Sequence, residues 1–229
     1  MSQTFSLVDS LCLGDLQVYL GRAGRAEDGS VRLIAGSGVL AVYVAVLYPS
    51  GLLDESPTIL GLRTFALTGR DTFDVVVPVR SLLERLSRLQ SGVVDPTAAV
   101  EVSLPMQVNT VTWAAISPPR GGWKNLGEFS GSTLDAVARA GIAEIATAIP
   151  GGTGEQIVHR VRSEVWGRPI EGLEYVAAGA GFAAFSLGFL GDGSGAVESV
   201  RIYETGPWTR LSTLRGHVLV KRRAWSLQR

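Results

Sequence analysis

The first half of the chain alternates apolar and polar positions in a pattern that predicts a sheet. Residues 39–48 carry apolar side chains at both phases of the alternation, which predicts a central strand covered on both faces. Leucines at the helical period predict short amphipathic helices at residues 13–23 and 81–89. Further strands are predicted where β-branched runs are bounded by turn residues, at residues 31–35, 58–67, 72–79, 99–104 and 107–115.

From residue 117 onward the periodicity becomes helical. The prolines and glycines of residues 117–123 disfavour regular structure and mark a boundary. Residues 132–135 and 153–156 have the capping-box pattern and predict two helix starts. The nearly all-apolar residues 171–190 predict a third helix, which should be buried. Strand patterns return at the end of the chain, at residues 197–203, 208–212 and 217–221.

Together these elements predict an α+β fold. A largely antiparallel N-terminal sheet with short helices should be followed by a helical segment closed by a C-terminal β-hairpin. With 229 residues, the chain suffices for one large domain or two small ones. We expect a mainly β domain or subdomain at residues 1–116. A helical subdomain with a basic hairpin should follow at residues 117–229, and the two can also pack as one domain.

Charge is divided unevenly along the chain. Residues 205–229 contain no acidic residue, whereas residues 1–204 hold all 21 acidic residues and 15 of the 21 basic ones, a net charge of −6. The overall net charge of zero therefore hides a basic C-terminal segment. Such a division can mark a docking surface or an anionic partner. The charged fraction of 18% leaves little polar cover for the surface and favours oligomerisation.

Residues 179–184 match the pattern G-x-G-x-x-A, with Glu204 following at the end of a predicted strand. In a dinucleotide-binding fold, the glycines would admit a pyrophosphate to a helix N-terminus and the acid would bind ribose hydroxyls. Too little chain follows for the rest of such a fold. We favour the alternative that these small residues allow close helix packing, and we expect no cofactor.

Candidates for catalysis are few. Cys12 could pair in space with His159 or His217, but a cysteine among leucines is more often a small apolar residue. These three side chains lack the spacing of metal ligands, and we expect no metal site. The sequence therefore does not favour an enzyme, and no catalytic residue is assigned.

Tryptophans next to basic residues offer another kind of site. Such neighbours can present stacking faces and cations to a ligand. The alternative is that arginine stems merely cover aromatic rings at the edge of a sheet. If the first interpretation holds, a ligand pocket between the sheet and the helices would include Arg120, Trp123, Trp166 and Arg168.

The leading hypothesis is a non-catalytic interaction protein that forms a homo-oligomer. It would dock through the basic hairpin, and an acidic patch on another protomer or on another protein would be its partner. The proposed interaction residues are Arg210, Arg215, His217, Lys221, Arg222 and Arg223.

Two other hypotheses remain open. One is nucleic-acid binding through the same hairpin, although a pI of 6.7 is low for a dedicated binding domain. The other is an enzyme or small-ligand binder that uses the pocket near Trp123 and Trp166. The first residues lack the basic start of a secretory signal, and the apolar runs are too short or too broken to span a bilayer. We therefore expect a cytoplasmic protein without a membrane partner.

Overall fold

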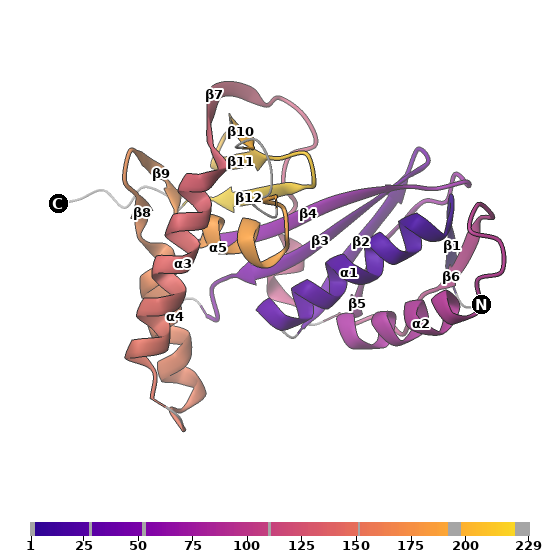
Figure 1. The fold of residues 1–229 in the computed structure, drawn as a ribbon, viewed down its shortest axis with the longest axis horizontal. Helices are drawn as coiled ribbons and strands as arrows, with labels where there is room; N and C mark the ends of the chain where they lie inside the picture. The colour runs from indigo at the N-terminus through magenta and orange to yellow at the C-terminus, as the bar shows by residue number, and fades with distance from the viewer. Residues whose placement is uncertain are drawn as a thin grey trace. The chain divides into compact units, whose positions relative to one another are not determined.

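The computed structural model describes residues 3–27, 29–51, 54–109, 111–150, 152–191 and 198–222 (Figure 1). It confirms the predicted α+β class, with antiparallel strands, helices and a C-terminal hairpin. The chain divides into two compact units. The first comprises Met1–Ala45 with Leu62–Ile116, and the second comprises Val46–Gly61 with Ser117–Arg229.

The first unit is built on a sheet with the strand order β5-β2-β3-β4. The hairpin of β2 and β3 turns at Ser37 and Gly38, whose φ values of 54° and 78° suit the twist of a tight β-hairpin. The strands are β2 (Ser30–Gly36), β3 (Val39–Leu47), β4 (Thr58–Ala66) and β5 (Phe73–Pro78).

Two β-α-β segments interlock in this unit. One consists of β1 (Thr4–Leu7), α1 (Ser10–Ala26) and β2; the other consists of β5, α2 (Val79–Ser91) and β6 (Val100–Ser103). The first strand of each segment pairs antiparallel with the last strand of the other, β1 with β6 and β5 with β2. The two helices pack side by side, and the phenolic hydroxyl of Tyr19 on α1 donates to the Val42 carbonyl of β3 at 3.4 Å.

Strand β3 is covered less completely than its pattern predicts. Leu40, Val42 and Val44 are buried on one face, as expected. On the other face, Val39 is 44% exposed and Tyr43 is only partly buried. The prediction of two covered faces is therefore wrong for the first half of the strand, because an antiparallel sheet can leave one face to solvent.

The strand predicted at residues 107–115 is also wrong. The chain there is irregular and then forms a short 3₁₀ helix, η1 (Thr112–Ala115). The Val108 amide donates to the Val76 carbonyl at 2.8 Å, so the segment still follows β5 for a short distance. The 3₁₀ turn buries Trp113 and Ala114 together, whereas a strand would point them to opposite faces.

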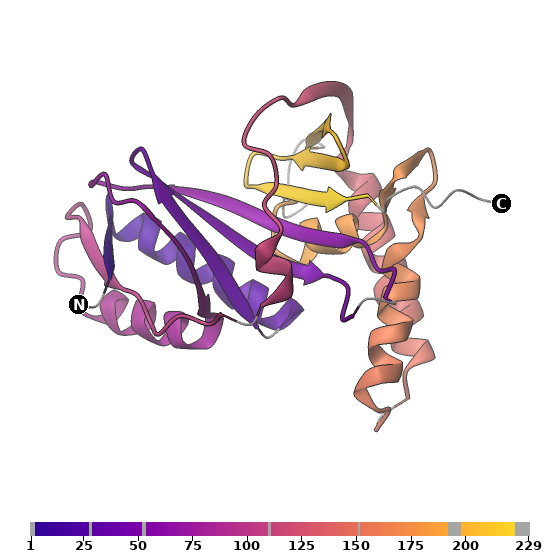
Figure 2. The same cartoon turned by 180° about the vertical axis from the view of Figure 1, so that it is seen from behind.

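The second unit has its own antiparallel strands. Beside the start of β4 lie β12 (His217–Lys221), β11 (Trp208–Ser212), β10 (Ser199–Thr205) and β7 (Lys124–Ser130), in that order (Figure 2). Leu211 lies opposite Val218, which confirms the predicted C-terminal hairpin. The edge strand β7 was not predicted, because its sequence lacks apolar alternation.

The helices of this unit are α3 (Gly131–Ala148), α4 (Glu155–Gly167) and α5 (Gly179–Ser186). The single helix predicted at residues 171–190 is wrong in its first part. A small hairpin of β8 (Pro169–Ile170) and β9 (Leu173–Ala177) precedes α5. Gly172 makes the turn with a φ of 76°, and the following Tyr175 and Val176 favour a strand.

Both predicted capping boxes are wrong in detail. Helix α3 is capped by Ser130, whose hydroxyl accepts from the Ser132 amide at 3.1 Å. Helix α4 begins after Gly154 without a side-chain cap. The Thr153 hydroxyl donates instead to the Pro150 carbonyl at 2.6 Å, one turn before the helix.

Close packing around Trp166 holds these helices together. The indole is 2% exposed and stacks on Phe182 of α5, with ring centroids 4.6 Å apart. Gly141 of α3 lies directly against the indole, and an added Cβ would overlap the ring. At Gly179, an added Cβ would lie 2.5 Å from Cδ1 of Ile59. Glycine is needed at both positions because no side chain fits.

Candidate interaction surface on the C-terminal hairpin

Strand register sorts the side chains of β10, β11 and β12 onto two faces. Val200 contacts Gly131 at the start of α3, and the residues aligned with it, Ile202, Leu211 and Val218, are buried. The opposite side, called the hairpin face below, carries most of the polar positions together with two buried apolar residues, Trp208 and Leu219. Its residues are Arg201, Tyr203, Thr205, Trp208, Arg210, Ser212, His217, Leu219 and Lys221.

Arg210 lies at the centre of the hairpin face. Its guanidinium carbon is 4.6 Å from the ring centroid of Trp123 and 4.5 Å from that of Tyr203. The Nε atom is buried and has no hydrogen-bond partner among the described residues. Burial lowers the pKa of Arg210 from its usual value. The arrangement supplies cation–π attraction without a counter-ion.

His217 lies on the same face, opposite Ser212 in the hairpin register. Its Nδ1 is 3.0 Å from the Ser212 hydroxyl. Burial is the main cause that lowers the pKa of His217 below its usual 6.5, and the positive charges of Arg210 and Arg201 lower it further. These effects favour the neutral imidazole in the folded chain.

Part of the basic charge is compensated within the fold. Arg222 donates to the Gly206 carbonyl at 2.7 Å, and its Nη2 is 3.7 Å from a carboxylate oxygen of Glu204. Lys124 approaches the other Glu204 oxygen at 4.0 Å. A single carboxylate of β10 therefore serves both cations, and Arg222 belongs more to the hairpin's own structure than to a free surface.

The other predicted interaction residues differ in position. Arg215 is exposed at the hairpin turn, where the Thr213 hydroxyl accepts from its amide at 3.1 Å. Lys221 is partly buried at the end of β12. Within the described part of the chain, neither forms an ion pair. Arg223 lies outside the described residues.

Sequence reasoning missed Arg201 and Tyr203. Both lie on β10, which was predicted as a strand but not as the neighbour of the hairpin. The register places Tyr203 opposite Arg210 and Arg201 opposite Ser212. Alternation along β10 could have selected them, because they differ in phase from Val200 and Ile202. Strand order, however, cannot be obtained from alternation.

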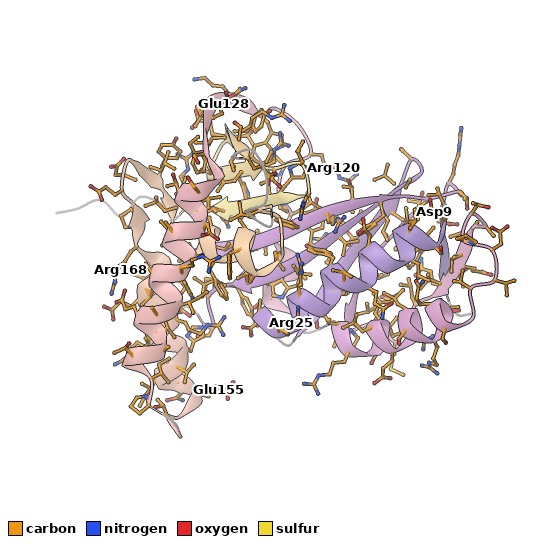
Figure 3. All side chains as sticks on the ribbon, viewed as in Figure 1. Asp9, Arg25, Arg120, Glu128, Glu155 and Arg168 are labelled. Carbon is orange, nitrogen blue, oxygen red and sulfur yellow. The ribbon has the colours of Figure 1, made fainter. Side chains whose placement is uncertain are left out.

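The residues of the predicted ligand pocket lie in different surroundings. Trp123 packs beside Arg210, and its indole donates to the Pro119 carbonyl at 3.2 Å. Trp166 is enclosed in the helical core. Arg168 pairs with Glu144 of α3 at 2.8 Å, while the exposed Arg120 precedes β7 (Figure 3). The pocket therefore stays a prediction that depends mainly on Trp123.

The G-x-G-x-x-A match lies inside α5 and supports close packing. An added Cβ at Gly181 would lie 2.9 Å from the Leu134 carbonyl oxygen of α3. Gly179 is enclosed by Ile59 and Trp166, as described above. The glycines therefore admit neighbouring protein atoms, and Glu204 binds the two cations on its own sheet.

The candidates for nucleophilic or metal chemistry have structural partners. The Cys12 amide donates to Oδ1 of Asp9 at 2.7 Å at the start of α1. Burial, together with Asp9, raises the pKa of the Cys12 thiol to about 11, so it is protonated at neutral pH. Among the described residues, no group of three or more His, Cys, Asp or Glu side chains could hold a metal ion.

The carboxylate of Asp54 organises the segment between β3 and β4 and lies close to α4. Asp54 accepts from the Ser50 amide at 2.7 Å and from the Ser56 amide at 2.9 Å, and also from both serine hydroxyls. Burial alone would raise the pKa of Asp54, but these hydrogen bonds outweigh it and hold the pKa well below its usual value. Nε2 of His159 on α4 lies 3.7 Å from Oδ2 of Asp54.

Within the described ranges, none of the helices has the length and apolar character to cross a membrane.

Two family models match separate parts of the chain. A domain of unknown function (DUF8010) matches residues 1–106, and another domain of unknown function (DUF8185) matches residues 118–225. The gap between them contains the point, after Ile116, at which the second unit resumes. No match was found among curated proteins.

Solved structures of sliding clamps show a distant likeness. A DNA polymerase sliding clamp from Caulobacter crescentus aligns with a TM-score of 0.49 at 12% identity, covering 99% of this chain and 67% of its own. The DNA polymerase III subunit beta from Pseudomonas aeruginosa gives 0.49 at 11%, covering 99% and 66%. The chain thus spans about two thirds of the length of these structures. With TM-scores below 0.5, the likeness supports no functional argument.

Proposed function

We propose that this protein is a non-catalytic interaction protein that self-associates by docking its basic C-terminal hairpin on an acidic surface of a second copy. The observation that carries the proposal is the excess of cations on and around the hairpin face. Arg201, Arg215 and Lys221 form no ion pair within the described residues, whereas Arg222 and Lys124 share Glu204. The hairpin therefore retains basic charge after its internal pairs are formed.

The rest of the chain provides the complementary charge. Residues 1–204 carry a net charge of −6, so a second copy supplies excess negative charge at the same concentration as the hairpin. Opposite charges steer association and fix its orientation. A low charged fraction of 18% further favours contact between copies.

The chemistry of the candidate nucleophiles supports a role without catalysis. The Cys12 thiol is protonated at neutral pH, and each histidine contacts a polar neighbour, His159 with Asp54 and His217 with Ser212. Nucleophilic catalysis needs a base within reach of the nucleophile. Cys12 interacts with Asp9 and Asp15, whose negative charges oppose its ionisation.

The test is size-exclusion chromatography with light scattering at low and high salt. We expect a species larger than the monomer at low salt that dissociates as salt rises. Charge reversal of two unpaired cations, R215E with K221E, should weaken association about tenfold, since each exposed pair contributes ~0.2–1 kcal/mol. The matched control is R70E, an exposed arginine of the first unit, which should not weaken association. A strict monomer at all salts would contradict the proposal.

Nucleic-acid binding is the second candidate, because Trp123 and Tyr203 combine aromatic rings with cations on one face. Arg210, however, lies over both rings at 4.6 and 4.5 Å and occupies surface on which bases would stack. We therefore expect no retardation of single-stranded or double-stranded probes at low salt. Salt-sensitive retardation that is lost in R215E with K221E would favour nucleic acid over a second copy.

A further inference from the structure

Arg210 is the least compensated charge on the hairpin face. A guanidinium has five N–H donors, yet the buried Nε of Arg210 has no hydrogen-bond partner among the described residues. The same residues supply no carboxylate within ion-pairing distance. The rings of Trp123 and Tyr203 hold the guanidinium by cation–π contact, but a ring face does not replace a hydrogen-bond acceptor.

The surroundings of Arg210 add further positive charge. The register brings Arg201 of β10 and His217 of β12 to positions opposite the same residue, Ser212. Both Arg210 and Arg201 act electrostatically on the His217 imidazole. The acidic residue aligned with this group is Glu128 of β7, opposite Arg201, and its Oε2 accepts from the Ser199 hydroxyl at 2.8 Å. The cations therefore outnumber the anions at this position.

We propose that Arg210, Arg201 and His217 form a binding site for a carboxylate of an acidic protein surface. A guanidinium presents its donors in a planar fork that matches a carboxylate, and the two rings fix that fork in place before binding. The site deepens the proposed function, because it names the group on the hairpin that receives the partner's acidic side chain. A carboxylate here would supply the counter-charge that the described residues do not give Arg210.

The site couples binding to the protonation of His217. Burial and the cations Arg210 and Arg201 disfavour the charged imidazole in the free protein. A bound carboxylate acts in the opposite direction and raises the pKa of His217 toward its usual value. The other groups on this face include Ser212, which hydrogen-bonds His217, and Tyr203, which lies opposite Arg210. Glu128 lies beyond Arg201, Lys221 lies further along β12, and Trp208 and Leu219 are uncharged and buried. Binding should therefore strengthen as the pH falls through the His217 pKa.

The experiment is a titration of the full chain with a hexaglutamate peptide, at protein concentrations low enough to keep it monomeric. The His217 ring is followed by NMR. We expect the His217 pKa to rise by about one unit on binding, which corresponds to about tenfold tighter binding to the protonated form. R210Q and R201Q should each weaken binding about tenfold or more, and R210K should also weaken it, because an ammonium lacks the fork.

R201Q tests the site even if the Arg210 variants fail to fold, because Arg201 is exposed and lies outside the ring contacts, so its loss should not disturb folding. The matched control R70Q removes an exposed arginine of the first unit, outside the hairpin, and should bind the peptide nearly as well as the unaltered chain. Peptide binding that survives both R210Q and R201Q, or a His217 pKa that does not move, would overturn the site. Tighter, Arg210-dependent binding of inorganic phosphate or a single-stranded oligonucleotide would overturn its assignment to a carboxylate.

The same titration separates this inference from the proposed function. If the peptide binds as expected but the chain is monomeric at every salt concentration, the carboxylate site is supported and self-association is not. If self-association responds to R215E with K221E but not to R210Q, the hairpin contact is supported and the carboxylate site is overturned.

Discussion

Two glycines, Gly141 and Gly179, set how closely the helices of the second unit approach Trp166. Both lie in segments in which alanine would ordinarily favour the helix. The indole occupies the space of a Cβ at Gly141, and Ile59 occupies it at Gly179. Composition could indicate close packing at these small residues, but it could not identify Trp166 as the partner, because the contact joins different helices.

The first residue-scale prediction concerns Gly141. G141A should lower the free energy of unfolding by about 1–3 kcal/mol, because overpacking against the indole outweighs a gain in helix propensity of at most ~1 kcal/mol. The matched control is G21A in α1, where an added Cβ meets nothing within 4 Å and stability should rise slightly. Denaturant unfolding of both variants is the measurement. Equal stabilisation by both substitutions would contradict the packing described for Trp166.

The second residue-scale prediction concerns His217 and pH. The unfolded chain binds a proton near pH 6.5, whereas the lowered pKa of folded His217 delays protonation to a lower pH. The free energy of unfolding should therefore be highest above pH 6.5 and fall as the pH decreases toward the lowered pKa. H217Q should remove this part of the pH dependence, as measured by denaturant unfolding from neutral to mildly acidic pH. An unchanged profile in H217Q would show that other groups cause it.

At the scale of elements, period and turn residues predicted most of the first unit. Apolar and β-branched runs bounded by turn residues located β2 to β5, and leucine spacing located α1 and α2. The failures share a physical cause. Residues 171–190 are nearly all apolar, so the spacing of their apolar positions does not distinguish helix from strand. The turn at Gly172 decides between helix and hairpin. Strand β7 lies at a sheet edge with exposed side chains and thus has no apolar pattern to detect.

The candidate site was predictable only in part. The basic segment and its hairpin followed from composition and alternation, and they identified Arg210, Arg215, His217 and Lys221. The ring contacts of Arg210 did not follow from the sequence, because Trp123 reaches it from the segment before β7 and Tyr203 reaches it from β10. Arg222 looked free in the sequence and is engaged by Glu204 and the Gly206 carbonyl.

A further prediction concerns the hydrogen bonds within the segment between β3 and β4. D54A should lower the free energy of unfolding by about 2 kcal/mol, because it removes an ionised acceptor of hydrogen bonds from Ser50 and Ser56. D95A is the matched control. Asp95 accepts comparable bonds from Thr97 in an exposed turn, and its loss should cost less. The free energies of unfolding of the two variants are measured by denaturant unfolding. An equal loss in D54A and D95A would contradict the role given to Asp54.

At the scale of the whole molecule, the two units are not divided by a single cut in the sequence. The second unit takes Val46–Gly61 from within the first half of the chain. That segment supplies the start of β4, which neighbours β12, and Ile59, which packs on Gly179. The boundary predicted near residue 117 cannot reveal this contribution of Val46–Gly61, because it depends on strand order.

The contribution of Val46–Gly61 to the second unit predicts how fragments of the chain should fold. Residues 117–229 expressed alone should lack a cooperative unfolding transition, because Gly179 loses Ile59 and β12 loses its neighbouring strand. A fragment in which residues 46–61 are joined to 117–229 through a flexible linker should regain part of that transition. Circular dichroism during denaturant unfolding compares the two. A fully cooperative transition in the shorter fragment would contradict the role assigned to Val46–Gly61.

Self-association through the basic hairpin can be tested by sedimentation equilibrium at about 0.1 M and about 1 M salt, over which the Debye length falls from ~10 to ~3 Å. A contact between opposite charges predicts an oligomer at the lower salt that dissociates at the higher one. It also predicts that R215E with K221E dissociates already at the lower salt while R70E does not. A monomer at both salt concentrations, or an oligomer equally insensitive to salt and to R215E with K221E, would contradict it.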